Sequence, residues 1–346
     1  MNKISIENAI NKKNYLFVDV RTPNEYLDGT IPNAINVPIY NNEERALIGY
    51  MYTKVSKWQA KEKGLEIAST KLYDIYKTIR SASANFKGVV IFCWRGGMRS
   101  GSIVTILNLM GLGNVYQLEG GYKGYRRFIL KEFDRWKSNI RFIVLRGNTG
   151  VGKTLLLDQL AENNLPVLNL ERLANHRGSV FGSIGLDKQP TQKNFEAFIY
   201  DTVMPVQNKL IFIESESGKI GSLFVPTFIT EKIVNGIHVH VTCNQEIRIQ
   251  RLLDEYLNAE KHQSINNIFN VLPLLKKYIS NTTYATLYEY LANKDFKNAA
   301  ALLLEQYYDP MYSKWNARYG KFQYKIDSSN IQDAVNQLIN IYNQIS

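Results

Sequence analysis

One of the two cysteines lies in a short loop rich in glycine and arginine. Cys93 follows the apolar run 89–92, and the sequence after it reads Trp-Arg-Gly-Gly-Met-Arg-Ser before a helical pattern at 103–110. In such a loop, backbone N–H groups and a helix N-terminus favour an anion and lower the pKa of a thiol. Arg95 and Arg99 add positive charge. The sequence therefore predicts a catalytic Cys93 thiolate assisted by both arginines, since a cysteine that only packs in a core would not need these neighbours.

A second loop matches the phosphate-binding pattern G-x-x-x-x-G-K-[ST] at every position. It occupies 147–154, directly after the apolar run 141–145 and before a helical pattern at 155–162. The glycines let backbone amides wrap a phosphate, Lys153 adds a point charge, and the Thr154 hydroxyl can hold a Mg²⁺ ion bound to a diphosphate. The residues expected to bind phosphate are Gly147, Asn148, Thr149, Gly150, Gly152, Lys153 and Thr154. The pattern leaves ATP binding and hydrolysis open.

Other loops at the same predicted sheet edge carry charged residues. The run 210–214 leads into Glu214 and Glu216, where phosphate-loop folds place an acidic residue, although glutamate replaces the usual aspartate. The loops 176–182 and 217–221 combine small and basic residues at the edge where open α/β folds bind ligands. We expect a supporting anion site formed by Arg177, Ser179, Glu214, Glu216 and Lys219. A solvated strand end and tight glycine turns are the alternatives.

Two arginines and two histidines give weaker signals. Arg248 and Arg251, on a predicted helix at 245–257, would either close over phosphates or face solvent. His238 and His240 alternate along a predicted strand and so share one face, but no cysteine, third histidine or carboxylate accompanies them at ligand spacing. We therefore predict no metal site made of protein ligands.

Two series of alternating strands and helices must position these loops. The predicted strands are 15–20, 89–92 and 115–118 in the first series, and 142–145, 167–170, 210–214 and 238–242 in the second. Such alternation is typical of parallel sheets with helical crossovers. We predict an α/β protein with a parallel-sheet domain at 1–135 carrying the cysteine loop, a phosphate-loop domain at 139–262, and a mostly helical C-terminal extension at 263–346 that ends in a helix at 331–345.

The composition excludes several classes of protein. With 346 residues, 45% of them hydrophobic, the chain has enough apolar area for two folded domains. Two cysteines in different sequence contexts argue against a disulfide framework. No stretch approaches the ~20 apolar residues that a membrane helix needs, and the N-terminus lacks the apolar core of a signal peptide. We expect a cytoplasmic protein with no membrane partner.

The charge of the chain favours a polyanionic partner. The formal net charge is +11, from 42 Lys and Arg against 31 Asp and Glu, and such an excess favours nucleic acid through phosphate neutralisation. In the segment 122–127, Lys123, Arg126 and Arg127 are interleaved with aromatic residues, as on RNA-binding surfaces. These three residues are candidate RNA contacts, and an ordinary amphipathic helix is an equally good interpretation.

The N-terminal part resembles the rhodanese-like domain family. The resemblance rests on Asp-Val-Arg-Thr-Pro at 19–23, Glu25-Tyr26 and the segment 29–38, and it spans about residues 1–130. It implies that Cys93 carries a transferable chalcogen. Five residues separate Cys93 from Arg99, one more than in the commoner sulfur-handling loops, and this is the spacing of phosphatase loops. A longer loop should hold a larger anion.

The order of the two loops in one chain indicates a family more specifically than either loop does alone. A Cys-Trp-Arg-Gly-Gly-Met-Arg-Ser loop, then a phosphate loop, then His-Arg-Gly-Ser and Glu-x-Glu resembles the tRNA 2-selenouridine synthase family over about residues 8–310. The resemblance implies a transferase that replaces the 2-thio sulfur of U34 by selenium from selenophosphate, through an S-geranyl intermediate made from geranyl diphosphate. It also implies that the phosphate loop holds the diphosphate, and that Cys93 accepts or orients selenium.

The same resemblance implies binding partners. It does not exclude other functions. The partners it implies are the anticodon arm of tRNAs for Lys, Glu and Gln and an enzyme that supplies selenophosphate. One alternative is a rhodanese-type sulfurtransferase or a phosphatase with an accessory nucleotide-binding domain, although Phe92 stands where phosphatases have a histidine before Cys93. Another is a P-loop kinase or regulatory module in which the cysteine domain is only structural.

Overall fold

The chain folds into two compact units. The computed structural model describes residues 2–257, 268–311 and 321–346. One unit comprises Met1–Glu132 with Thr191–Phe198, and the other comprises Phe133–Pro190 with Ile199–Ser346. Thr191 lies with the first unit because its hydroxyl donates to the carbonyl of Asp28 at 2.8 Å, a contact across the sequence that no local pattern indicates. The predicted boundary at 262–263 lies outside the described residues.

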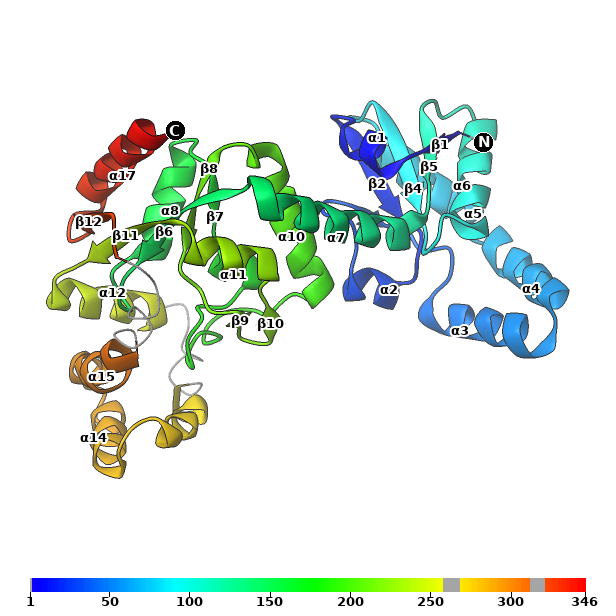
Figure 1. Cartoon of the computed structure of the whole chain (residues 1–346). Coiled ribbons are helices and arrows are strands. Elements are labelled where there is room, and N and C mark those ends of the chain that lie inside the picture. Colours follow the sequence, from blue (N-terminus) through cyan, green and yellow to red (C-terminus); the bar gives the residue numbers. More distant parts are fainter. Residues whose placement is uncertain (1, 258–267, 312–320) are drawn as a thin grey trace. The chain divides into compact units, whose positions relative to one another are not determined.

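The first unit is built on a five-stranded parallel sheet with the order β1-β5-β4-β2-β3 (Figure 1). Its strands are β1 (Lys3–Ile4), β2 (Tyr15–Asp19), β3 (Ile35–Asn36), β4 (Gly88–Phe92) and β5 (Val115–Leu118). Its helices are α1 (Ile6–Ile10), α2 (Pro23–Asp28), α3 (Asn42–Tyr50), α4 (Lys57–Ser69), α5 (Leu72–Ala82) and α6 (Met98–Leu109), with a π-helical turn at Met51–Val55; α7 (Gly121–Asn139) runs on into the second unit. The central strand β4 is buried along its whole length, so Cys93 emerges from the middle of the sheet.

The second unit has its own parallel sheet, with the order β12-β11-β6-β8-β7. Its strands are β6 (Arg141–Arg146), β7 (Val167–Leu168), β8 (Leu210–Glu214), β11 (Ile237–Thr242) and β12 (Tyr324–Asp327), and β9 (Lys219–Ile220) pairs with β10 (Leu223–Phe224) in a small hairpin. Its helices are α8 (Lys153–Glu162), α9 (Leu170–Ala174), α11 (Thr227–Val234), α12 (Gln245–Leu257), α14 (Asn281–Ala292), α15 (Phe296–Leu303) and α17 (Ile331–Ile345); α10 (Gln192–Val203) begins in the first unit. Shorter turns are Met204–Val206, Leu272–Lys277 and Leu304–Tyr308.

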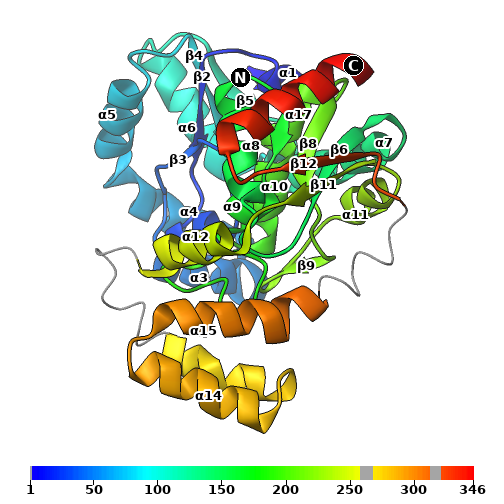
Figure 2. The same cartoon turned by 90° about the vertical axis from the view of Figure 1, so that its left-hand side faces the viewer.

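The C-terminal part is mostly helical, as predicted, but it also completes the sheet. Helices α14 and α15 lie together, with α15 between α12 and α14 (Figure 2). The strand β12 then pairs in parallel with β11, and α17 packs its buried face, including Leu338, on the sheet core. The β12 strand was not predicted.

The α/β class and the longer elements are confirmed. The bounds of β5, β8, α12 and α17 agree with the predicted ranges, whereas the predicted strand 167–170 ends at Leu168. It ends there because the Asn169 side chain accepts the N–H of Arg172 and caps α9. Over the part of the chain that the structure describes, no helix is both long and apolar enough to cross a membrane.

Candidate functional site

The sulfur of Cys93 is surrounded by hydrogen-bond donors at the end of β4. Its Sγ accepts the N–H of Gly97 at 3.3 Å and lies 3.2 Å from the hydroxyl oxygen of Ser100, while only 3% of the residue is exposed. Ser100 Oγ in turn accepts an N–H from Gln117 at 2.9 Å, and its own proton can go to the sulfur at 3.2 Å or to the Gly97 carbonyl at 3.4 Å. Burial by itself raises the pKa of Cys93, but these hydrogen bonds and the charge of Arg99 more than offset it, so the net shift is downward. The site favours a thiolate.

The first turn of α7 holds the cysteine loop from the other side. The N–H groups of Tyr122 and Lys123 donate to the carbonyls of Cys93 and Trp94, both at 2.9 Å. This approach requires glycine at position 121, where φ is +56° and a Cβ atom would lie 2.2 Å from the Cys93 carbonyl oxygen. The loop carbonyls are therefore engaged away from the sulfur.

The two arginines of the cysteine loop differ in environment. Arg99 makes an ion pair with Glu25, with Nη1–Oε2 at 2.7 Å, and Glu25 also accepts the N–H of Thr22 in the capping box of α2. Burial raises the pKa of Glu25, but Arg99, the Thr22 N–H and the charge of Arg21 together lower it more, so the carboxylate and Arg99 are both charged. Arg95 is exposed. The structure therefore joins Arg99 to the cysteine and leaves Arg95 at the surface.

A buried ion pair supports the neighbouring strand end. Arg21 Nη2 lies 2.6 Å from Asp19 Oδ2 and 2.6 Å from the carbonyl oxygen of Gly29, and both charged side chains are almost fully buried. The Arg21 guanidinium also lies 4.1 Å from the ring centre of Tyr122, in α7. The Asp-Val-Arg segment thus connects the end of β2 to the helix that holds the cysteine loop.

In the second unit, the predicted phosphate loop connects β6, the middle strand, to α8. Lys153 Nζ donates to the carbonyls of Gly147 at 2.9 Å and Asn148 at 3.3 Å, so its charge lies over the loop. Gly150 and Gly152 have φ of +80° and +83°, which glycine adopts readily and which turns backbone N–H groups towards an anion. The seven predicted phosphate-binding residues thus lie in the loop after β6 and the first turn of α8, at a switch point of the sheet where β6 has β8 on one side and β11 on the other.

Side chains from two distant segments hold the carbonyls of this loop. Arg248 Nε donates to the carbonyl of Thr149 at 2.9 Å, and its guanidinium makes an ion pair with Asp309. Arg251 and the Ser328 hydroxyl both donate to the carbonyl of Val151, at 2.9 Å and 2.6 Å. The solvent-facing interpretation of the two arginines is therefore wrong, because both side chains bind the backbone of the phosphate loop. Closure over a phosphate stays a prediction.

Three glutamates gather beside Lys153 and Thr154. The Thr154 hydroxyl donates to Glu171 Oε2 at 3.0 Å, and the Glu171 N–H donates to Glu214 Oε1 at 2.9 Å. A Cβ atom added at Gly178 would lie 3.0 Å from Glu216 Oε2 and 3.2 Å from Glu171 Oε1, so Gly178 borders both carboxyls. Sequence reasoning missed Glu171, which follows the short strand β7 and carries no motif of its own.

Burial changes the protonation of this cluster. It raises the pKa of Glu214, which is 1% exposed, to about 8, and the charge of Glu171 adds to the effect. Burial likewise raises the pKa of Glu216 well above its usual value and lowers that of Lys153. Glu214 is therefore mostly protonated at neutral pH. Within 2–257, 268–311 and 321–346, no group of three or more His, Cys, Asp or Glu side chains is arranged to hold a metal ion.

The predicted basic residues of the supporting site lie apart. Arg177 makes an ion pair with Glu255 and lies 5.0 Å from the ring centre of Tyr256, and Ser179 is half-buried in the same loop. Lys219 is exposed on the β9–β10 hairpin. The structure therefore brings Glu214 and Glu216 to the phosphate loop, places Arg177 and Ser179 in the adjoining loop, and does not bring Lys219 to the cluster.

The three candidate RNA contacts lie on α7. Lys123 and Arg127 are exposed, whereas Arg126 makes an ion pair with Glu196 and is half-buried. The interleaved aromatic residues Tyr122 and Tyr125 are buried. The segment is therefore an amphipathic helix whose aromatic residues pack inward, and only its exposed cations can meet a phosphate backbone.

We expect the wild type to lose stability as the pH rises from 6 to 8, and Glu214→Gln to lose less. In the folded protein the pKa of Glu214 is about 8, above the ordinary value of 4.5. The protonated carboxyl therefore contributes its full stabilisation below pH 4.5, and this contribution is lost as the pH rises through 8. Loss of this one proton lowers the free energy of unfolding by about 2 kcal/mol between pH 6 and 8. Calorimetric Tm should therefore fall less steeply over this range in the variant than in the wild type.

The matched control for this experiment is Glu246→Gln, which makes the same substitution at an exposed position. Its Tm profile should follow that of the wild type. Parallel profiles for wild type and Glu214→Gln would contradict the protonation of Glu214.

Comparisons with known proteins cover both loops. A model of the rhodanese-like domain matches residues 4–128, and a model described as the tRNA 2-selenouridine synthase AAA domain matches residues 140–341. Several relatives carry the name tRNA 2-selenouridine synthase. The protein of Sulfurovum sp. (strain NBC37-1) is 30% identical over 85% of this chain and 87% of its own length. That of Hydrogenovibrio crunogenus is 30% identical over 94% and 95%, and that of Nitrosomonas eutropha is 33% identical over 70% and 63%.

Proposed function

This chain belongs to the tRNA 2-selenouridine synthase family, and we propose that it replaces the 2-thio sulfur of the wobble uridine, U34, of tRNA by selenium. The observation that carries the proposal is the presence in one chain of two anion-binding loops with different chemistry. One centres on a cysteine with a lowered pKa, and the other is a complete phosphate loop with Lys153 over it. Such a pair suits a reaction with two anionic co-substrates.

The first step would use the phosphate loop and geranyl diphosphate. The C–O bond of geranyl diphosphate breaks, a bond forms between its carbon and the 2-thio sulfur, diphosphate leaves, and the base loses its N3 proton. Lys153 and the loop N–H groups would stabilise the charge on the leaving diphosphate. A Mg²⁺ ion bound by Thr154 and the diphosphate would add positive charge there. Because Glu214 is mostly protonated at neutral pH, it repels this anion less than a carboxylate would.

The second step would use the cysteine loop and selenophosphate. Alkylation turns the sulfur into a group that can leave as geranyl thiolate. Selenium of selenophosphate attacks C2 of the base, the C2–S bond breaks, and water then cleaves the P–Se bond to release phosphate. Cys93, as a thiolate, would orient the donor and accept its proton, and the adjacent N–H of Gly97 and charge of Arg99 suit an anion.

The RNA would bind through its phosphates and its unstacked wobble base. The net charge of +11 and the exposed Lys123 and Arg127 support phosphate contacts. A base that undergoes chemistry has to leave its stack to reach a protein loop. We propose that the acceptors are the anticodon arms of tRNAs for Lys, Glu and Gln in the cytoplasm, and that a second enzyme supplies selenophosphate.

A single assay tests this function. Purified full-length protein is incubated with tRNA that contains 2-thiouridine, with geranyl diphosphate and with selenophosphate. The tRNA is then digested to nucleosides, and their masses are measured by mass spectrometry. We expect a nucleoside in which selenium replaces sulfur, formed through a geranylated intermediate. The proposal fails if the nucleoside stays unchanged while the folded protein binds the tRNA.

The same preparation separates the alternatives. Turnover of thiosulfate or of a phosphoester without RNA would favour a sulfurtransferase or a phosphatase with an accessory nucleotide-binding domain. Transfer of phosphate from ATP that survives Cys93→Ala would favour a P-loop kinase.

A further inference from the structure

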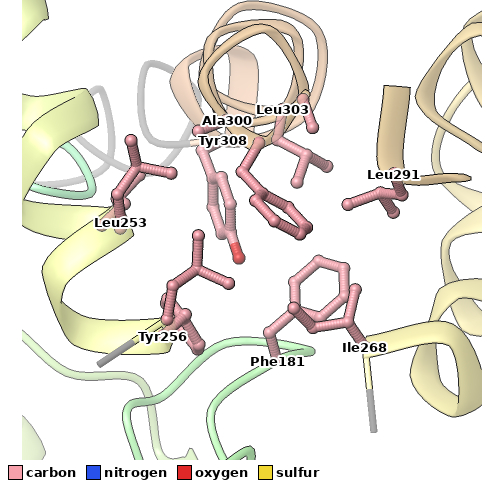
Figure 3. A pocket seen from close by; sticks show the side chains of 12 residues that line it. Phe181, Leu253, Tyr256, Ile268, Leu291, Ala300, Leu303 and Tyr308 are labelled. Carbon is pink, nitrogen blue, oxygen red and sulfur yellow. The ribbon is translucent and has the colours of Figure 1, made fainter. Parts of the chain in front are cut away.

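An apolar pocket lies in the second unit, between α12, the α14–α15 pair and the loop that carries Phe181. Figure 3 shows side chains from these segments around one space, among them Phe181, Leu253, Tyr256, Leu291, Ala300 and Leu303. The empty volume of the pocket, including the part open to solvent, is about 570 Å³. Sites for small organic ligands are concave and lined mostly by hydrophobic and aromatic side chains, as this pocket is.

This pocket is not an ordinary gap in a core. Protein interiors pack as densely as organic crystals and contain few voids larger than a water molecule. The surrounding cluster is well packed elsewhere, since Leu272, Leu275 and Leu287 in it are almost fully buried. Because its lining is almost wholly apolar, the pocket is a poor site for water, which needs polar partners, and a good site for a hydrocarbon.

Two connections place the pocket next to the phosphate loop. The first is α12, whose Arg248 and Arg251 bind carbonyls of the phosphate loop, while Leu253 and Tyr256 further along line the pocket. At a rise of ~1.5 Å per residue, the eight residues from Arg248 to Tyr256 span about 12 Å. The arginines that hold the phosphate loop and the α12 side chains that line the pocket therefore all lie within about two turns of one helix.

The second connection is the loop at 176–182. Gly178 borders the carboxyls of Glu171 and Glu216, and Glu171 accepts the Thr154 hydroxyl. Phe181, three residues further on, lines the pocket. One short loop therefore reaches from the phosphate loop to the apolar space.

We propose that this pocket binds the hydrocarbon chain of a prenyl diphosphate whose charged end lies in the phosphate loop. The inference rests on the proposed function, which supplies the diphosphate co-substrate. An extended chain of eight carbons spans about 9 Å at ~1.3 Å per bond, which covers most of the ~12 Å along α12 and passes the nearer lining residues, Leu252 and Leu253. The amphiphilic ligand and the protein match at both ends, phosphate on backbone N–H groups and Lys153, and hydrocarbon on leucine and aromatic side chains.

The test measures binding by calorimetry on the full chain, without RNA or selenophosphate, using inorganic diphosphate and dimethylallyl, geranyl and farnesyl diphosphates. Burial of each CH₂ group tightens binding by about fourfold, and partial burial with ordering costs reduces the total. We expect geranyl diphosphate to bind about 100-fold more tightly than inorganic diphosphate. Similar affinities for the two would overturn the inference.

Variants of the lining locate the chain. Ala300→Phe fills the pocket and should weaken geranyl diphosphate about tenfold or more while inorganic diphosphate binds as before. Leu291→Ala enlarges it and should shift the preference towards farnesyl diphosphate, which keeps the test decisive if Ala300→Phe does not fold. The matched control is Leu274→Ala, an exposed leucine outside the pocket lining. Wild-type chain-length preference in both lining variants would overturn the pocket assignment.

The two proposals can fail separately. If tRNA is converted but the lining variants keep wild-type preference, only the pocket assignment is wrong. If chain length controls binding and the lining variants change it, while tRNA is never converted, the pocket assignment stands and the proposed reaction is wrong.

Discussion

Cys93→Ala should stop the reaction at the S-geranyl nucleoside when the protein is given thiolated tRNA, geranyl diphosphate and selenophosphate. The variant loses the only group in the cysteine loop that can become an anion near Gly97 and Ser100. We expect the selenium step to slow by about 10³-fold, the scale seen when one aimed stabilising group is removed. Geranylation should continue, because the phosphate loop belongs to the other unit. Nucleoside masses over time measure both rates.

Two further substitutions make the result specific to the thiol. Cys93→Ser keeps a similar volume but replaces the thiolate by a hydroxyl that stays protonated, so it should fail as Cys93→Ala does. Cys243→Ala removes the other cysteine, which is half-buried, and should retain both steps. Wild-type selenium transfer by Cys93→Ser would exclude a thiolate role and leave Cys93 as a packing residue.

The parts of the fold that the sequence predicted are those with long apolar signals. Strands β4 and β8 are buried along their whole length and consist mostly of β-branched and aromatic residues, so they stand out from the chain around them. Strands β1 and β3 have two residues each, too few to show a period. Strand β12 is an edge strand with one buried residue, Ile326, and its pairing with β11 depends on chain closure over a long distance.

The candidate site was predictable where its residues are consecutive. The phosphate loop needs glycines and a lysine at set intervals, and the structure arranges them accordingly. Glu171 reaches Thr154 only because β7 and β8 are neighbours in the sheet, a relation that no local pattern contains. Lys219 illustrates the opposite case, because a small, basic loop has the same composition in a ligand site as in the exposed hairpin that the structure shows.

The partners of helical side chains were the other feature that the sequence could not predict. The period of a helix predicts which face is apolar, but not which partner a charged residue on that face will meet. Arg248 and Arg251 bind the carbonyls of Thr149 and Val151, about 100 residues earlier in the chain. In α7, the same limit left the role of Tyr122 open, and burial rather than RNA stacking is the outcome.

Lys153→Ala should show the reverse of the Cys93 result. With thiolated tRNA and geranyl diphosphate, we expect the geranylation rate to fall by about 10²- to 10³-fold, because the variant lacks the charge over Gly147 and Asn148 that would stabilise the leaving diphosphate in the proposed reaction. With tRNA that is already S-geranylated, the variant should transfer selenium at the wild-type rate. Initial rates of the two half-reactions, measured separately, give both numbers.

The crossed pattern carries more information than either loss alone. A general defect would slow both half-reactions in both variants, and Lys188→Ala, which removes an exposed lysine from the same unit, reports the background effect of such a substitution. Removing Lys153 leaves less uncompensated charge than three free carboxylates would, because burial raises the pKa of Glu171, Glu214 and Glu216 alike, so the variant should fold. If Lys153→Ala loses both half-reactions while retaining wild-type Tm, the phosphate loop must also act on selenophosphate, and the assignment of one loop to each step would be wrong.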